Sequence, residues 1–247
     1  MIKEDYVMLM GKRNFLVKLN NEKFHTQYGI LDLSKIKKMN WGNKIYTHSN
    51  EMFVIVKPTM IDFLNKKMKR LPQIITPEDT SLILSVTGIP DKSLIVDAGT
   101  GSGFLCMFLG YYLKNSKIIT YEKNTNFYNS AKKNIEMLKL KNVKIVNEDI
   151  TDGMKEKNVD MVTLDMKDAE KIIEDAYKSL KIGGWLVVFS PYIEQVKLVI
   201  NEINKYNFVN LKTIENIRRE WQTEVFTRPK TLGIMHTGWL TFARKIY

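Results

Sequence analysis

The sequence predicts an α/β fold of the doubly wound type, preceded by a small β-rich module. Residues 93–96 form a short apolar run typical of a buried parallel strand. A glycine-rich turn at 97–103 leads from this run into a long apolar segment at 104–113, which predicts a helix packed on a sheet. Short apolar runs then alternate with helical patterns along the rest of the chain. Strand, glycine turn and helix form the first unit of a doubly wound domain.

The glycine turn has the composition of a ligand-binding loop. Gly99, Gly101 and Gly103 allow the backbone to bend tightly and to approach a ligand closely. The free N–H groups at the start of the following helix, from Phe104, favour anionic or polar ligand groups. Glycine turns also join strands to helices where no ligand binds, so this loop alone leaves both interpretations open. The spacing disfavours a nicotinamide dehydrogenase, whose fingerprint is G-x-G-x-x-G.

Carboxylates follow the next predicted strands. The strand at 117–122 ends in Glu122, the strand at 143–146 is followed by Glu148 and Asp149, and the strand at 159–165 ends in Asp165. Since parallel strands end at one edge of a sheet, we expect these acids to lie beside the glycine loop. Glu122 is placed to accept hydrogen bonds from the two hydroxyls of a ribose, although a solvated strand-end glutamate is an alternative. Asp149 could accept a hydrogen bond from the amino group of an adenine.

The remaining elements complete the sheet. Thr76 is a good N-cap and Pro77 a good first residue for a helix that runs to about residue 86. We expect further helices at 124–140, 168–180 and 193–205, and a strand at 185–189. Segments 208–215 and 239–244 can form an antiparallel pair that closes a seven-stranded sheet. The long connection between them carries Arg218, Arg219 and Arg228, which could face RNA.

The N-terminal part differs in pattern and charge. Short apolar runs at 6–10, 15–17, 44–46 and 52–56, with 29–33 between them, predict a small β-rich module, and 57–70 a helix-like linker. We therefore divide the chain into a module at 1–70 and a catalytic domain at 71–247. The formal net charge is +11, and residues 1–70 hold 14 Lys and Arg against 6 Asp and Glu, or +8 of it. A lysine-rich proteome would spread charge more evenly, so the module suggests a polyanionic partner.

Composition excludes several classes of protein. The single cysteine, Cys106, lies in the apolar helix, so neither a disulfide framework nor a cysteine metal site is possible within one chain. This usage fits a reducing cytoplasm and argues against a cysteine-dependent pyrimidine C5 methyltransferase. The three histidines lack metal-ligand spacing, so we expect no metal. No apolar run is long enough to cross a membrane.

The glycine loop with its strand-end acids resembles a class I S-adenosylmethionine (SAM)-dependent methyltransferase, a Rossmann-like fold. Almost the whole chain is similar to the tRNA adenine-N1 methyltransferase family, which modifies adenosine 58 in the T-loop and, in some archaeal members, adenosine 57. The matching stretches are 28–33, Arg70 with 72–75, 99–103, 164–165, 190–196, 227–229 and 236–245. The resemblance implies methylation of adenosine 58, with 57 left open, and a homotetramer.

The resemblance also implies roles for residues. The family's catalytic aspartate falls on Asp165 and its ribose-binding acid on Glu122. The expected cofactor-binding residues are Gln73, Ile75, Asp97, Gly99, Gly101, Ser102, Gly103, Phe104, Glu122, Glu148, Asp149 and Asp165. The expected substrate contacts are Tyr192, Arg228 and His236, although His236 is about as well explained as a hydrogen-bonded structural residue. The chain departs from the family's usual pattern at Thr76, Glu78 and the Met166–Lys167 pair, all near the expected adenine pocket.

Two other functions remain open. A small-molecule methyltransferase, such as the corrinoid-pathway enzymes, shares the loop and strand order, but it has no need of the basic module. A non-catalytic RNA-binding subunit would not need the intact loop with Glu122 and Asp165. Exocyclic-amine methyltransferases usually carry an Asn/Asp-Pro-Pro-aromatic motif after the fourth strand. Leu164-Asp165-Met166-Lys167 lacks that motif, which favours a ring nitrogen as the methyl acceptor.

Overall fold

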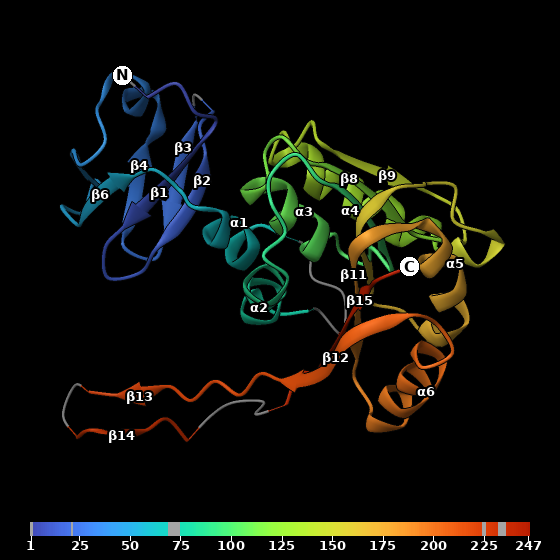
Figure 1. Ribbon diagram of the computed structural model, residues 1–247. Coiled ribbons are helices and arrows are strands. Elements are labelled where there is room, and N and C mark those ends of the chain that lie inside the picture. Colours follow the sequence, from blue (N-terminus) through green and yellow to red (C-terminus); the bar gives the residue numbers. More distant parts are fainter. Residues whose placement is uncertain (1, 21, 69–74, 224–225, 232–235) are drawn as a thin grey trace. The chain divides into compact units, whose positions relative to one another are not determined.

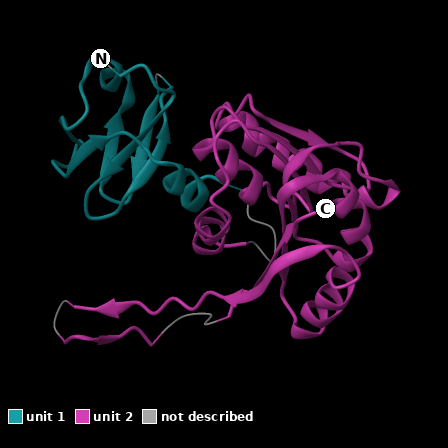
Figure 2. Cartoon of the chain, in the orientation of Figure 1, with its two compact units in different colours: residues 1–68 teal, residues 69–247 magenta. Residues whose placement is uncertain are grey.

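The chain folds into two compact units. The computed structural model describes residues 2–20, 22–68, 75–223, 226–231 and 236–247. Unit 1 comprises Met1–Met68 and unit 2 comprises Lys69–Tyr247 (Figure 2).

Unit 1 is built on an antiparallel sheet. Its strands have the order β2-β1-β6-β5, and they comprise β1 (Tyr6–Met10), β2 (Phe15–Lys18), β5 (Lys44–Tyr46) and β6 (Met52–Val56). A hairpin of β3 (Lys23–Thr26) and β4 (Gly29–Asp32), the 3-10 helix η1 (Leu33–Lys38) and helix α1 (Met60–Lys66) complete the unit. Leu9, Leu31, Ile36, Phe53 and Ile55 are fully buried in its core. The predicted β-rich module is confirmed.

Unit 2 contains the predicted seven-stranded sheet. Among the described residues, the strand order is β12-β15-β11-β10-β7-β8-β9; β15 runs antiparallel to β12 and β11, and the other pairs are parallel. The strands are β7 (Leu94–Ala98), β8 (Lys117–Tyr121), β9 (Val143–Val146), β10 (Val159–Leu164), β11 (Leu180–Ser190), β12 (Phe208–Glu215) and β15 (Trp239–Lys245). The expected antiparallel pair is therefore formed by β12 and β15 (Figure 1).

Helices cover this sheet. They are α2 (Pro77–Thr87), α3 (Phe104–Tyr112), α4 (Thr125–Met137), α5 (Ile173–Ser179) and α6 (Ile193–Ile203), with the 3-10 helices η2 (Ile150–Asp152) and η3 (Ala169–Ile172). Helix α3 packs against β8 and β9, and α6 packs against β11 and β15. The predicted helix at 168–180 is thus divided into η3 and α5.

Side chains of the central strands alternate between the two faces of the sheet. Val162 and Leu164 of β10 belong to the same buried cluster as Ile173 of α5 and Val199 of α6. Thr163, between them, donates a hydrogen bond to Asp97 of β7 instead. This alternation follows from the two-residue period of a strand. Parallel pairing of β7 with β8 and with β10 brings the ends of these strands together at the carboxyl edge of the sheet.

The connection between β12 and β15 is an arm. Two short strands, β13 (Trp221–Gln222) and β14 (Arg228–Pro229), pair antiparallel within it. Figure 1 shows this hairpin projecting from the end of β12, away from the seven-stranded sheet. Within the described parts of the chain, no helix has the length and apolar character needed to span a membrane.

Candidate active site

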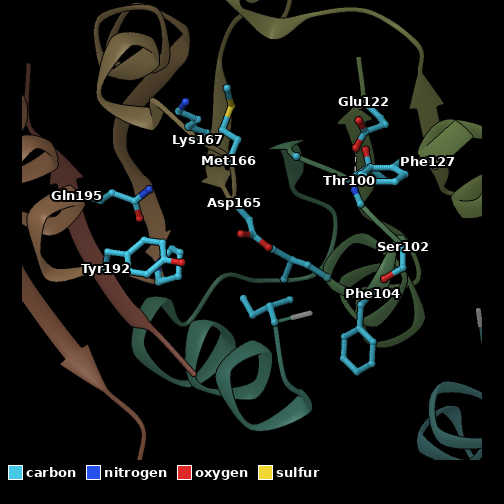
Figure 3. Close-up of a pocket in the computed structure, with 15 residues that line it drawn as sticks. Thr100, Ser102, Phe104, Glu122, Phe127, Asp165, Met166, Lys167, Tyr192 and Gln195 are labelled. Atoms are coloured by element: carbon cyan, nitrogen blue, oxygen red, sulfur yellow. Dashed lines mark hydrogen bonds between the residues drawn. The ribbon is translucent and has the colours of Figure 1, made fainter. Parts of the chain in front are cut away.

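A cavity of ≈ 470 Å³ opens at the carboxyl edge of the seven-stranded sheet. The glycine loop, Glu122, Asp165 and the start of α6 line it (Figure 3). Ligand crevices in doubly wound folds lie at this edge. The cavity is therefore the candidate active site.

The glycine loop is held in place by its neighbours. The N–H groups of Gly99 and Thr100 both donate to the carbonyl of Tyr121 on β8. Asn134 of α4 donates to the carbonyl of Ser102 at 2.9 Å. Gly99 has φ +86°, and a Cβ there would lie 1.9 Å from the carbonyl oxygen of Asp165. Any side chain at position 99 would therefore displace the backbone of Asp165.

Gly103 begins the helix that follows the loop. It is the N-cap of α3 with φ +84°, and it makes no side-chain capping bond. Ser102 and Phe104 flank it, and both line the cavity. The first N–H groups of a helix have no partner within the helix, so they are available to polar ligand groups here.

Asp97 is buried beneath the loop. Its side chain is 1% exposed, and its two oxygens accept hydrogen bonds from Thr120 of β8 and Thr163 of β10, each at 2.6 Å. Burial raises the pKa of this carboxyl, while the two threonine bonds oppose the rise. Asp97 is not among the residues that line the cavity, so its position is that of a support between three strands.

Glu122 lies where β8 ends, at the wall of the cavity. It is buried, and its oxygens accept hydrogen bonds from the N–H groups of Gly101 and Asn124, each at 2.9 Å. A carboxylate has about four acceptor positions, so both oxygens retain capacity for a ligand's hydroxyl groups.

A second, smaller cavity of ≈ 90 Å³ adjoins the first. The two share Gly99, Glu122 and Met166 as lining residues, and Glu148 and Asp149 line the smaller one. Asp149 accepts a hydrogen bond from the Thr151 N–H, and this bond is the main reason why the pKa of its carboxyl is lowered. The crevice is thus elongated, with Glu122 between its two parts.

Asp165 projects into the larger cavity from the end of β10 (Figure 3). Its own N–H donates to the carbonyl of Ala98 at 2.8 Å, which fixes its backbone beside the glycine loop. The side chain is half-buried. Burial, followed by the nearby carboxylates of Asp97 and Asp79, raises the pKa of Asp165 to about 8. A cation in this cavity would lower the pKa and favour the carboxylate.

Helix α2 begins close to the crevice. Ile75 is buried and lines the cavity. Thr76 is the N-cap, as predicted, and it forms a capping box: its hydroxyl oxygen accepts from the Asp79 N–H at 3.2 Å, and the Asp79 carboxylate accepts from the Thr76 N–H at 3.4 Å. Glu78, a departure from the family's usual pattern, forms an ion pair with Arg218 at the base of the arm. Gln73, Arg70 and Pro72 lie outside the described residues.

The structure separates the three expected substrate contacts. Tyr192 is 56% exposed and lines the cavity. Arg228 is exposed on β14 of the arm and does not line it. His236 bonds Glu215 through Nδ1 at 2.6 Å and the Pro191 carbonyl through Nε2 at 3.3 Å. The carboxylate of Glu215 is the main cause of its raised pKa. Both ring nitrogens of His236 thus have partners within the protein, and one partner, Pro191, lines the cavity.

Sequence reasoning gave no role to several residues that line the cavity. Gln195 and Phe127 are among them, together with Met166 and Lys167, which were noted only as departures. Little in the sequence indicates that Gln195 lines the cavity, because this residue lies within the matching stretch 190–196 but belongs to no motif of its own. Phe127 follows the end of β8 by only a few residues, which could have placed it near the crevice.

The seven-stranded sheet with a glycine loop and strand-end acids defines a methyltransferase of the class I fold. The family described as "tRNA methyltransferase complex GCD14 subunit" matches residues 53–228, and the chain belongs to this family.

Relatives agree with this assignment. A tRNA (adenine(57)-N(1)/adenine(58)-N(1))-methyltransferase of Methanocaldococcus jannaschii is 36% identical, covering 95% of this chain and 92% of its own. The crystal structure of the tRNA (m1A58) methyltransferase of Aquifex aeolicus has a TM-score of 0.83 at 28% identity, covering 100% of this chain and 99% of its own. A structure described as a SAM-dependent O-methyltransferase of Thermotoga maritima has a TM-score of 0.90 at 29% identity, covering 100% and 95%.

Proposed function

We propose that this protein transfers a methyl group from SAM to N1 of adenosine 58 in the T-loop of tRNA, with adenosine 57 as a second candidate target. The observation that carries the proposal is the position of Asp165, which projects from the end of β10 into a crevice shared with the glycine loop and Glu122. Membership of the tRNA methyltransferase family supports tRNA as the substrate.

The crevice fits SAM. The cofactor is elongated, and the two adjoining cavities share Glu122, whose oxygens can still accept the ribose hydroxyls. We propose that Asp149 and Glu148 contact the adenine end, since both line the smaller cavity. The loop from Gly99 to Gly103 and the start of α3 would bind the rest through backbone N–H groups. We assign Asp97 an indirect role, because it is buried beneath the loop and does not line the cavity.

The chemistry requires alignment and charge stabilisation. When bound, SAM supplies a methyl group activated by its sulfonium. Adenine N1 has a lone pair and needs no prior deprotonation; as N1 bonds the methyl carbon, the carbon–sulfur bond breaks and the positive charge passes to the adenine. Asp165 accepts a hydrogen bond from the 6-amino group, which orients N1 and stabilises the developing charge. Loss of such a group lowers rates by about 10²–10³-fold.

The target adenosine lies inside the folded tRNA elbow, so the enzyme must expose it by flipping the base or loosening the T-loop. We propose that the basic residues of the 1–70 module bind phosphates of the tRNA. In unit 1, Lys35, Lys37 and Lys38 follow one another closely in the last turn of η1, and Lys37 and Lys38 are exposed. Binding through such residues weakens steeply with salt. We also propose that Arg228 on the arm contacts tRNA and that Tyr192 contacts the exposed base.

The first test is methyl transfer from labelled SAM to unmodified tRNA transcripts, one of which has adenosine 58 replaced. We expect N1-methyladenosine in the T-loop by mass spectrometry, lost when adenosine 58 is replaced. Transfer confined to position 57 would retain the chemistry and change the target. SAM binding without transfer to tRNA would support the small-molecule rival instead.

An Asp165→Ala variant tests the catalytic role within the same assay. We expect it to bind SAM and to methylate at least about a hundredfold more slowly. Methylation at the parental rate would exclude this role for Asp165. A homotetramer, which the resemblance implies, is the assembly that we propose, and sedimentation equilibrium would test it. The cytoplasm is the proposed location, where unmodified tRNA and SAM are both present.

A further inference from the structure

Gln195 is a polar residue of the cavity to which the proposed function gives no role. It lies in the first turn of α6, three residues after the N-cap Tyr192. It lines the cavity, and Figure 3 shows its carboxamide pointing toward the carboxylate of Asp165 across that cavity. The two side chains therefore face the space in which a substrate base would lie.

The carboxamide oxygen of Gln195 is buried and unpaired. Among the described residues, it is one of four buried side-chain polar atoms that have no hydrogen-bond partner. Gln195 occupies N3, from which a glutamine can bond back to the N-cap, yet α6 has no side-chain capping bond. Buried acceptors are nearly always paired, because an unpaired one is destabilising. Because this oxygen is buried in the free protein while the rest of the side chain lines the cavity, the amide must turn for a donor from the substrate to pair with it.

A glutamine carboxamide is complementary to one edge of adenine. Its oxygen accepts from the 6-amino group while its NH₂ donates to N7. The amino group has two hydrogens, one directed to the N7 side and one to the N1 side. Gln195 would accept a hydrogen bond from the hydrogen on the N7 side and Asp165 from the hydrogen on the N1 side, so the two residues do not compete. N1 then remains free to accept the methyl group.

We propose that Gln195 is a specificity-determining residue that binds the N6/N7 edge of the target adenine; this rests on the proposed function. Guanine offers two acceptors on that edge, O6 and N7, whereas the carboxamide has one donor group and one acceptor. Whichever way the amide is turned, its oxygen would face an acceptor. A bidentate pair of this kind discriminates between bases by about tenfold to hundredfold.

The test uses tRNA in which adenosine 58 is replaced by 7-deazaadenosine, which has C–H in place of N7 and retains N1 and the amino group. We would measure kcat/KM on both tRNAs with the wild type, Gln195→Met and Gln195→Ala. Glu194→Gln is the matched control, since Glu194 precedes Gln195 on α6, is exposed and does not line the cavity. SAM affinity, measured in parallel, shows that each variant is folded.

We expect the preference for adenosine over 7-deazaadenosine to be about tenfold or more greater in the wild type than in either Gln195 variant. Comparing variants removes the difference in intrinsic reactivity between the two bases. Glu194→Gln should behave as the wild type does. An equal preference in all four proteins would overturn the role of Gln195 while leaving the proposed function intact. Failure of the wild type to methylate adenosine at either position 58 or position 57 would overturn both.

Discussion

The raised pKa of Asp165 predicts that SAM binding depends on pH. Burial and the carboxylates of Asp97 and Asp79 raise this pKa to about 8, so the free protein at neutral pH holds Asp165 mostly protonated. The sulfonium of SAM is a cation, whereas S-adenosylhomocysteine carries a neutral sulfur. Binding of SAM should therefore lower the pKa of Asp165 and release a proton, and binding of the product should not.

The size of the effect follows from the charges. An opposite charge within about 4–6 Å of a carboxylate lowers its pKa by about 1–3 units, and a fall of two units corresponds to about 3 kcal/mol. A fall in the pKa of Asp165 from about 8 to roughly 6 makes SAM bind about 50-fold more tightly at pH 9 than at pH 6. At pH 7 the binding event should release about 0.8 proton.

Isothermal titration calorimetry in buffers of different ionisation enthalpy measures both quantities. The ratio of the SAM and S-adenosylhomocysteine dissociation constants removes groups common to the two ligands. Asp165→Asn should make this ratio independent of pH. Asp168→Asn is the control, because it makes the same chemical change at a residue that does not line the cavity. A ratio that stays flat from pH 6 to 9 in the wild type would refute the reasoning.

Three further predictions concern the crevice and its supports. Gly99→Ala should abolish SAM binding, because its Cβ would meet the Asp165 carbonyl oxygen; Gly88→Ala is the control, since Gly88 also has a positive φ but lies outside the cavity, and it should lower the free energy of unfolding by about 1 kcal/mol with SAM binding unchanged; an equal loss of SAM binding in the two variants, measured by equilibrium dialysis, would contradict this. Glu122→Gln should raise the dissociation constant of SAM by about tenfold or more, because charge-assisted bonds are about twice as strong as neutral ones; an unchanged constant would show that the ribose lies elsewhere. Thr76→Ala should lower the free energy of unfolding by about 0.5–2 kcal/mol through loss of the α2 cap, and Thr76→Ser should restore most of it.

The strands of the sheet and its acid-lined edge were predictable from the sequence because they depend on local patterns. The apolar runs that became β7, β8 and β10 each end near an acid, and parallel strands end at one edge. The N-cap at Thr76 also follows from local sequence. Strand β3 was missed because Lys23–Thr26 has little apolar alternation and is defined only by its pairing with β4.

Other features depend on contacts between distant residues. Asp97 was expected at the cofactor, but it is buried and does not line the cavity, and its neighbours in the sheet, Thr120 and Thr163, each donate a hydrogen bond to it. Nothing in the sequence near position 97 identifies those two threonines as partners. The contact of His236 with Glu215 likewise depends on the pairing of β12 with β15. The orphaned oxygen of Gln195 is visible only once its surroundings are known.

The arm between β12 and β15 bears on how such a protein can diverge. Its two sides are tied together beside the β13–β14 pair, where the Lys230 N–H donates to the Glu220 carbonyl at 2.8 Å. Residues beyond that bond begin and end at neighbouring points, and a doubling of such a loop's length costs only about 0.6 kcal/mol in closure entropy. Insertions and deletions there should therefore change the stability of the seven-stranded sheet very little. Related proteins can therefore differ in the length and sequence of this part of the arm, and a tag can be inserted there, without a change in the sheet or in the cavity at its carboxyl edge.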